Sequence, residues 1–249
     1  THEEQEEIGR RGCCQRCHRV GTMIINAQEL KNFYTDKGYA PHEHIKEFFQ
    51  DDTYEELRKN YPADELFKDE MPKSRKENQR PHHRRLMCFF KGQHQFFDKF
   101  NVGLDKLPKV WQELINLILD PVGEYQSWIR QTLKVKDISI RLDFHRTHSG
   151  SDVSPHLDTA SKHGSHLFYF MPDGWEDEFG GTTVFYKDKT VPQMNPEPQD
   201  FKEYKTYPVK GNYSLLFKNT GNGWHGITPV KNNMGLQRQM FSAVIQQAK

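Results

Sequence analysis

The feature that most constrains this chain is a histidine–aspartate pair, His156 and Asp158, that is followed much later by a second histidine, His225. In an extended segment the side chains of residues i and i+2 point to the same side, so the pair can reach one metal ion. Asp158 lies 67 residues (225 − 158) before His225, so only the tertiary fold can bring the third residue to the other two. Two imidazoles and one carboxylate leave one face of an octahedral ion open, which suits non-heme Fe(II) that binds a chelating co-substrate and O₂.

A fixed positive charge follows this set. Arg238 lies 13 residues after His225 and begins a mostly apolar run that extends to Ile245. A buried arginine needs an anionic partner, and its guanidinium can hold a carboxylate through two parallel hydrogen bonds. We therefore expect Arg238 to bind the far carboxylate of the co-substrate. Ser242 lies four residues later, on the same face of an extended strand, and is a candidate to assist in this binding.

The segments around these residues have the alternating pattern of β-strands. Residues 138–145 alternate apolar and polar side chains, and a polar turn over 147–152 then leads to the histidine–aspartate pair. His225 lies between a strand-like run and the alternating run that follows Arg238. For this reason we favour it as the third metal ligand over the other candidates, which are His145, His148, His163 and His166.

In this order of strands and motifs, residues 37–246 resemble a 2-oxoglutarate-dependent Fe(II) dioxygenase of the prolyl-hydroxylase-like group. The resemblance is carried by His156 and Asp158, by the run Gly-Gly-Thr-Thr-Val-Phe at 180–185, by His225 with Gly226, and by Arg238. It implies an all-β core with flanking helices, in which the core is a double-stranded β-helix, or jelly roll.

The resemblance also implies the cofactors and the reaction. Fe(II) would be bound by His156, Asp158 and His225, and Arg238 would hold 2-oxoglutarate, which reacts with O₂. The co-substrate would leave as succinate and CO₂ while a C–H bond of the substrate is hydroxylated. Halogenases of the family replace the carboxylate by a small residue, so Asp158 favours hydroxylation over halogenation. Desaturation and ring closure use the same ligands and stay open.

Two further sets of residues are candidates for the pocket, and each has a second interpretation. Tyr169 lies where several members of the group place a tyrosine that helps to bind the co-substrate, but an aromatic core strand explains it equally well. Arg141, Asp143 and His145 share one face of the strand that leads to the metal site. They either line the substrate pocket or form a solvated face. A polar pocket would suit a polar small molecule, a sugar or a peptide.

We divide the 249 residues into three regions. Residues 1–36 are an N-terminal extension that is partly peripheral, residues 37–137 are a helical support region of the catalytic domain, and residues 138–249 are the β-helix core with the iron site. The proline-containing polar stretch 187–208 is predicted to be a long loop that covers the substrate.

One strand and four helices are predicted before the β core. A short strand at 22–25 precedes a helix that begins at Asn26, and Asp52 is predicted to cap a helix over 53–60. The next helix begins near Leu107, because apolar side chains then recur at helical spacing on one stripe. The members of that stripe are Val110, Trp111, Leu114, Ile115 and Ile118. One more helix is predicted through Tyr125 and Trp128.

Charge and hydropathy give no sign of a nucleic-acid or membrane partner. The formal net charge is +1, which provides no attraction to nucleic acid or to an anionic membrane. No apolar run approaches the ~20 residues that a membrane span needs, and no signal peptide is visible, so we expect a cytoplasmic protein. The basic stretch over 71–86 is a candidate patch for an anionic partner, but we favour a solvated loop.

A cysteine-containing segment, with Cys13, Cys14, Cys17 and His18, has no place in the enzyme hypothesis. Its C-x-x-C-H pattern matches haem attachment and offers half of a zinc site, although we favour a polar segment with free thiols. The segment defines the alternative function, a non-catalytic β-helix module with a metal- or partner-binding arm. A complete metal set together with Arg238 argues for the enzyme.

Overall fold

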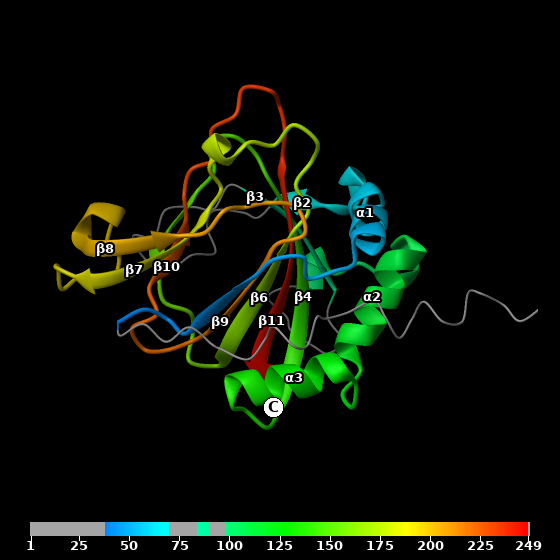
Figure 1. Ribbon diagram of the computed structural model, residues 1–249, viewed down its shortest axis with the longest axis horizontal. Helices are drawn as coiled ribbons and strands as arrows, with labels where there is room; N and C mark the ends of the chain where they lie inside the picture. The colour runs from blue at the N-terminus through cyan, green and yellow to red at the C-terminus, as the bar shows by residue number, and fades with distance from the viewer. Residues whose placement is uncertain (1–37, 70–83, 90–97, 249) are drawn as a thin grey trace, which may run out of the picture.

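Two antiparallel β-sheets form the centre of the computed structural model, which describes residues 38–69, 84–89 and 98–248 (Figure 1). The helices are α1 (Asp51–Lys59), α2 (Lys109–Leu119) and α3 (Glu124–Leu133). The strands are β1 (His42–Ile45), β2 (Lys68–Asp69), β3 (Arg84–Phe89), β4 (Ile138–Thr147), β5 (Val153–His156), β6 (Lys162–Tyr169), β7 (Thr183–Lys189), β8 (Phe201–Thr206), β9 (Ser214–Lys218), β10 (His225–Ile227) and β11 (Arg238–Gln247). The larger sheet has the order β1-β9-β6-β11-β4-β3-β2, and the smaller sheet has the order β5-β10-β7-β8.

The strands of the larger sheet have two different faces, as their alternating sequences predict. On β11, Phe241 and Ala243 belong to a core that also contains side chains of all three helices. Met240 points the other way, into a second core with Tyr169 of β6 and Phe185 of the smaller sheet. One face of the larger sheet is therefore covered by helices, and the other packs against the smaller sheet. This arrangement confirms the all-β double-stranded β-helix core with flanking helices.

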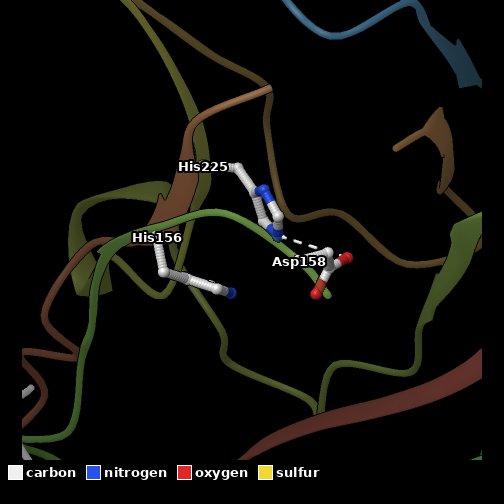
Figure 2. A group of neighbouring side chains, drawn as sticks. All are labelled: His156, Asp158 and His225. Atoms are coloured by element: carbon white, nitrogen blue, oxygen red, sulfur yellow. Dashed lines mark ion pairs between the residues drawn. The ribbon is translucent and has the colours of Figure 1, made fainter. Parts of the chain in front are cut away.

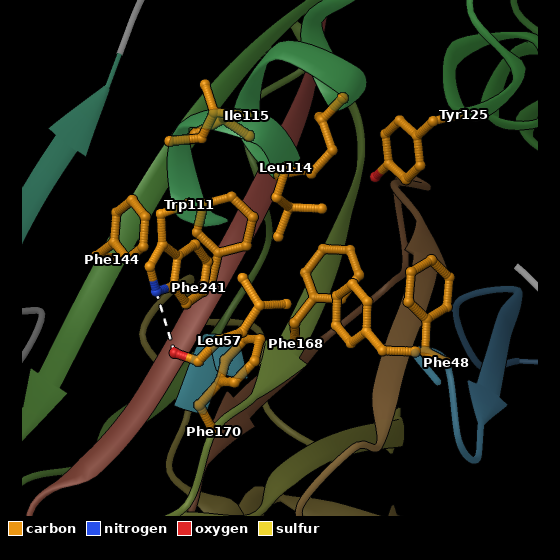
Figure 3. Close-up of a cluster of buried hydrophobic side chains, with 14 of the residues drawn as sticks. Phe48, Leu57, Trp111, Leu114, Ile115, Tyr125, Phe144, Phe168, Phe170 and Phe241 are labelled. Atoms are coloured by element: carbon orange, nitrogen blue, oxygen red, sulfur yellow. Dashed lines mark hydrogen bonds between the residues drawn. The ribbon is translucent and has the colours of Figure 1, made fainter. Parts of the chain in front are cut away.

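Helix α2 attaches the helical layer to the larger sheet through Trp111, which is fully buried. Its ring lies 4.8 Å from Phe144, 5.0 Å from Phe170 and 5.2 Å from Phe241, measured between centroids (Figure 3). Its Nε1 donates a hydrogen bond of 3.1 Å to the carbonyl of Leu57 in α1. All five members of the predicted apolar stripe of α2 are buried, so the helix and the face that it buries are confirmed.

Two predictions about local structure are wrong. Helix α1 begins at Asp51, with Gln50 as the N-cap residue, so Asp52 is not its cap. The Asp52 carboxylate accepts the backbone N–H of the adjacent Thr53 instead. The stretch 187–208 is not one long loop, because it contains the end of β7 and all of β8. Strand β8 is an edge strand with mostly exposed side chains, so it lacks the apolar alternation that reveals a strand.

Several predictions concern residues that lie outside the described part of the chain. These are the strand at 22–25, the helix from Asn26, the Cys13–His18 segment and most of the basic stretch over 71–86. The division into three regions stays a prediction, and within 37–137 the strands β1, β2 and β3 extend the larger sheet. Among the described residues, no helix is both long and apolar enough to cross a membrane.

Candidate metal centre and co-substrate pocket

His156, Asp158 and His225 converge at the same end of two neighbouring strands of the smaller sheet, β5 and β10. His156 is the last residue of β5 and His225 is the first residue of β10, and the two are paired in the antiparallel ladder. Their ring centroids lie 4.4 Å apart, and one potential ligand atom from each of the three residues lies within 4.8 Å of the others (Figure 2). In the described part of the chain, this is the one group of histidine, cysteine and acidic side chains that is close enough to hold a metal ion.

Backbone carbonyl groups fix the orientation of both imidazoles. Nδ1 of His156 donates to the carbonyl of Ser154 at 3.0 Å, and Nδ1 of His225 donates to the carbonyl of Gly223 at 2.9 Å. Because a carbonyl can only accept, each Nδ1 carries the proton, and Nε2 is the nitrogen that can bind a metal. The Nε2 atom of His225 points toward Asp158 and lies 3.8 Å from its Oδ2.

The carboxylate of Asp158 is held by one oxygen only. Nζ of Lys162 donates to Oδ1 at 2.6 Å, whereas the buried Oδ2 accepts no hydrogen bond from the described residues. A buried acceptor without a hydrogen bond is costly, and a cation bound to Oδ2 would remove that cost. The three residues therefore suit a divalent metal ion, because the unpaired Oδ2 lies beside two oriented imidazoles.

The protonation states also suit a metal ligand set. Burial, reinforced by the neighbouring His225, lowers the pKa of His156 to about 3, so its imidazole is neutral at pH 7. Burial alone would raise the pKa of Asp158, but Lys162 and the two histidines outweigh it and keep that pKa well below its usual range. Neutral imidazole and ionised carboxylate are the forms that bind metals.

The residues next to the three candidate ligands anchor them from the outside of the smaller sheet. Leu157 and Trp224 both pack in a cluster with Val184, Tyr186 and Phe201. Glycine follows His225 for a steric reason, because a Cβ on Gly226 would lie 2.5 Å from the carbonyl oxygen of Val153. These contacts fix the two segments that carry the histidines.

Arg238 lies at the first position of β11 and is 1% exposed. Its guanidinium carbon is 5.5 Å from the ring centroid of Tyr169, and the Tyr169 hydroxyl is hydrogen-bonded to Thr183 Oγ1 at 3.0 Å. Gly181 has a φ of +68°, and a Cβ there would lie 2.7 Å from Arg238 Cδ. The Gly-Gly motif therefore gives the arginine side chain the room that it occupies.

Ser242 lies on the same face of β11 as Arg238 but four residues further along, which is ~13 Å in a strand. Its hydroxyl is 3.3 Å from Nε2 of His145. The structure therefore brings Tyr169 to Arg238, and it brings Ser242 to a residue that the sequence places in the substrate pocket.

Arg141, Asp143 and His145 are buried, which excludes a solvated face for this set. Nε and Nη2 of Arg141 donate to the two carboxylate oxygens of Asp143 at 2.9 and 2.8 Å. Burial alone would raise the pKa of Asp143, but the attraction of Arg141 outweighs it and lowers the pKa to about 2. Asp158 is among the charges that raise the pKa of Arg141, so Arg141 and this candidate metal ligand interact electrostatically.

Lys162 is the principal residue of the site that sequence reasoning missed. The sequence offers a weak indication of its role, because Lys162 is the one charged residue other than histidine between Asp158 and Tyr169. It also follows Asp158 by four residues.

Comparison with known proteins agrees with this geometry. Residues 142–244 match the sequence profile of the 2OG-Fe(II) oxygenase superfamily. No curated protein sequence matches the chain.

Three solved structures illustrate the structural likeness. A prolyl-4-hydroxylase from Pseudomonas putida has a TM-score of 0.53 and 14% identity, covering 84% of this chain and 94% of that one. A prolyl hydroxylase from Trichoplax adhaerens, in complex with a peptide fragment of the hypoxia inducible factor oxygen degradation domain, has a TM-score of 0.51 and 11% identity, covering 83% of each chain. HygX from Streptomyces hygroscopicus, with nickel, 2-oxoglutarate and hygromycin B bound, has a TM-score of 0.51 and 12% identity, covering 84% of each chain. At these identities the likeness shows a shared fold.

Proposed function

We propose that this chain, which belongs over residues 142–244 to the 2OG-Fe(II) oxygenase superfamily, hydroxylates a C–H bond of a polar substrate. As an oxygenase of this superfamily it uses Fe(II), 2-oxoglutarate and O₂, and it releases succinate and CO₂. The observation that carries the proposal is the convergence of His156, Asp158 and His225 in a fold whose interior also holds a buried arginine, Arg238.

His156, Asp158 and His225 are the proposed ligands of Fe(II). A facial set of three ligands leaves room for a chelating co-substrate and for O₂. Bound here, the metal couples the oxidative decarboxylation of 2-oxoglutarate to the oxidation of a C–H bond. The chain contributes oriented Nε2 atoms and an ionised carboxylate.

Arg238 is the proposed anchor for the far carboxylate of 2-oxoglutarate. Tyr169 is proposed to support it, because burial raises the pKa of its hydroxyl, which therefore stays protonated and can donate. Ser242, hydrogen-bonded to His145, lies further along the same face of β11 and is proposed to line the wall beside the co-substrate. An arginine suits this task because its charge is fixed and its two parallel N–H groups match a carboxylate.

Arg141, Asp143 and His145 are proposed to line the substrate pocket. They place a buried ion pair and an imidazole on the interior face of β4, which favours a substrate with hydrogen-bonding groups over an apolar one. Among the similar structures, one contains a peptide fragment and another contains hygromycin B, so the fold accommodates both kinds of ligand. We therefore keep polar small molecules, sugars and peptides as the proposed substrate class.

The function is tested by 2-oxoglutarate turnover in the protein loaded with Fe(II), with succinate as the measured product. A panel of amino acids, peptides and sugars is added, and the substrate is the compound that increases succinate formation and gains one oxygen atom by mass spectrometry. Failure to form succinate under any of these conditions, in a protein that binds Fe(II), would overturn the proposal.

A further inference from the structure

A charged cleft of about 550 Å³ lies at the end of β6 that is remote from the metal centre. Its walls come from α1, from residues 171–178 that follow β6, and from residues 209–211 that precede β9. Lys162, which holds Asp158, begins β6, whereas Met171 of the cleft lies two residues beyond its end. At about 3.3 Å per residue these positions are roughly 30 Å apart along the strand. None of the three proposed metal ligands lines the cleft, and neither does Arg238.

Negative charge predominates in this cleft. Five carboxylates line it, from Glu55, Asp173, Glu176, Asp177 and Glu178, and the two basic side chains are Arg58 and Lys210. Arg58 is engaged by Asp173 at 2.9 Å and by Glu55 at 2.8 Å, and Lys210 lies 3.6 Å from Asp177. Among the described residues the metal-capable group is the one around His225, so these carboxylates do not gather tightly enough to chelate an ion.

Two buried polar atoms in the cleft have no hydrogen-bond partner among the described residues. They are the hydroxyl of Tyr54, a residue that is 7% exposed, and Nε1 of Trp175. Burial raises the pKa of Tyr54 to about 12 and outweighs the opposing effect of the nearby backbone N–H of Asn212. The hydroxyl therefore stays protonated at neutral pH. Both groups are donors, and leaving a buried donor unpaired is costly.

A ligand complementary to this cleft carries both positive charge and hydrogen-bond acceptors. A metal ion or a simple amine has no acceptor, and a nucleic acid has the wrong charge for a cleft with five carboxylates. A basic polypeptide segment has both, because its main-chain carbonyl groups accept hydrogen bonds and its lysine or arginine side chains carry the charge. Gly211 keeps the cleft open at the hydroxyl, since a Cβ there would lie 2.6 Å from Tyr54 Oη.

We propose that this cleft binds a lysine- or arginine-containing polypeptide segment. Its basic side chains face Glu176 and Glu178, and its carbonyl oxygens accept hydrogen bonds from Tyr54 and Trp175. The site is independent of the iron centre, so the proposal does not depend on the proposed oxygenase activity.

The test is fluorescence anisotropy with a labelled octapeptide that alternates lysine and glycine, and with matched peptides in which glutamine or glutamate replaces lysine. The lysine peptide should bind, the other two should bind at least ~10-fold more weakly, and added salt should weaken binding of the lysine peptide. The double variant Glu176→Gln with Glu178→Gln should reduce affinity ~3- to 10-fold, as expected for exposed ion pairs. Tyr54→Phe should reduce it by a similar factor through the lost hydrogen bond.

Two control variants distinguish binding in this cleft from binding elsewhere on the protein. Glu124→Gln removes an exposed carboxylate of α3 that does not line the cleft and should leave the affinity unchanged. His225→Ala should also leave it unchanged, because the iron centre is not involved. Equal affinity for the lysine and glutamine peptides would overturn the proposal. So would an unchanged affinity in the Glu176/Glu178 double variant.

Discussion

Lys162 and Asp158 form an ion pair of 2.6 Å at the metal centre, and this pair decides which oxygen of the carboxylate faces the two histidines. Lys162 Nζ holds Oδ1, so Oδ2 is the atom directed toward His225. The pair also keeps Asp158 ionised in a buried position, since Lys162 is the strongest of the charges that lower its pKa. A residue outside the candidate ligand set thus sets the geometry and the charge of a proposed metal ligand.

Replacing Lys162 should therefore weaken metal binding without removing a ligand. Loss of such an outer contact costs metal affinity about 10- to 100-fold, and we expect this range for Lys162→Met. The measurement is calorimetric titration with Mn(II) or Fe(II) under anaerobic conditions. Lys136→Met, at an exposed lysine, serves as the control. An affinity equal to that of the wild type would show that Lys162 does not position Asp158.

His225→Ala should abolish succinate formation while the protein stays folded, because it removes one of three proposed ligands. The partly buried His163 was an alternative third ligand in the sequence and lies outside the group that can hold a metal. His163→Ala is therefore the matched comparison, and it should retain metal binding and turnover. Circular dichroism establishes folding of both variants. Full turnover in His225→Ala would remove His225 from the ligand set.

The buried pair of Arg141 and Asp143 should contribute strongly to stability as long as both partners are present. Asp143→Asn leaves the Arg141 guanidinium in the interior without its carboxylate, which typically costs ~3–5 kcal/mol. Asp105→Asn removes an exposed carboxylate and should change the free energy of unfolding by less than ~0.5 kcal/mol. Urea unfolding of the two variants provides the comparison. Similar small effects in both would show that the Arg141 charge is compensated by another group.

His166 should make the protein sensitive to acid. It is fully buried, its Nδ1 is 3.2 Å from the Tyr125 hydroxyl, and burial lowers its pKa well below 6.5. The unfolded chain therefore binds the proton more readily, so this contribution to stability is complete above pH ~6.5 and is lost as the pH falls below it. Between pH 7 and pH 5 the loss from this one group approaches ~2 kcal/mol.

The variant His166→Leu isolates this effect, because its packing cost is the same at both pH values. Between pH 7 and pH 5, the free energy of unfolding should fall by ~2 kcal/mol less in this variant than in the wild type. Substitution of the exposed His148 by glutamine should leave the pH dependence of the wild type unchanged. Parallel pH profiles for the wild type and His166→Leu would contradict the prediction.

The strands and helices that were predicted from the sequence are those whose two faces differ most in polarity or in packing partner. Strands β4 and β11 lie between the helical core and the barrel interior, and α2 presents one apolar stripe, so each carries a strong periodic pattern. Strands β1 and β8 are each at one edge of their sheet. Their sequences, His-Glu-His-Ile and Phe-Lys-Glu-Tyr-Lys-Thr, contain too few apolar residues to reveal strands.

At the site, the sequence reveals the residue types but not the contacts between them. The three candidate metal ligands and the arginine can be found in the sequence because each lies in a short motif with a chemical meaning. The contact of Gly181 with Arg238 joins segments that are far apart in the chain, and the pairing of Lys162 with Asp158 depends on how residues 159–161 turn back. Only the folded structure supplies such relationships.

Arg238 should determine the affinity for 2-oxoglutarate and not the affinity for the metal. A hydrogen bond to a charged group contributes ~1.5–3 kcal/mol, and tenfold in affinity is about 1.4 kcal/mol. Arg238→Ala should therefore raise the apparent KM for 2-oxoglutarate at least ~10-fold, and Arg238→Lys should be intermediate because a point charge replaces a planar fork.

Gly181→Ala should raise the apparent KM for 2-oxoglutarate as well, because the new Cβ would displace the arginine side chain. Gly235→Ala is its control, since Gly235 has a similar φ of +72° but no neighbour within 4 Å. The measurement is succinate formation against 2-oxoglutarate concentration, with metal affinity titrated in parallel. If Arg238→Ala follows the wild-type curve, another residue anchors the co-substrate.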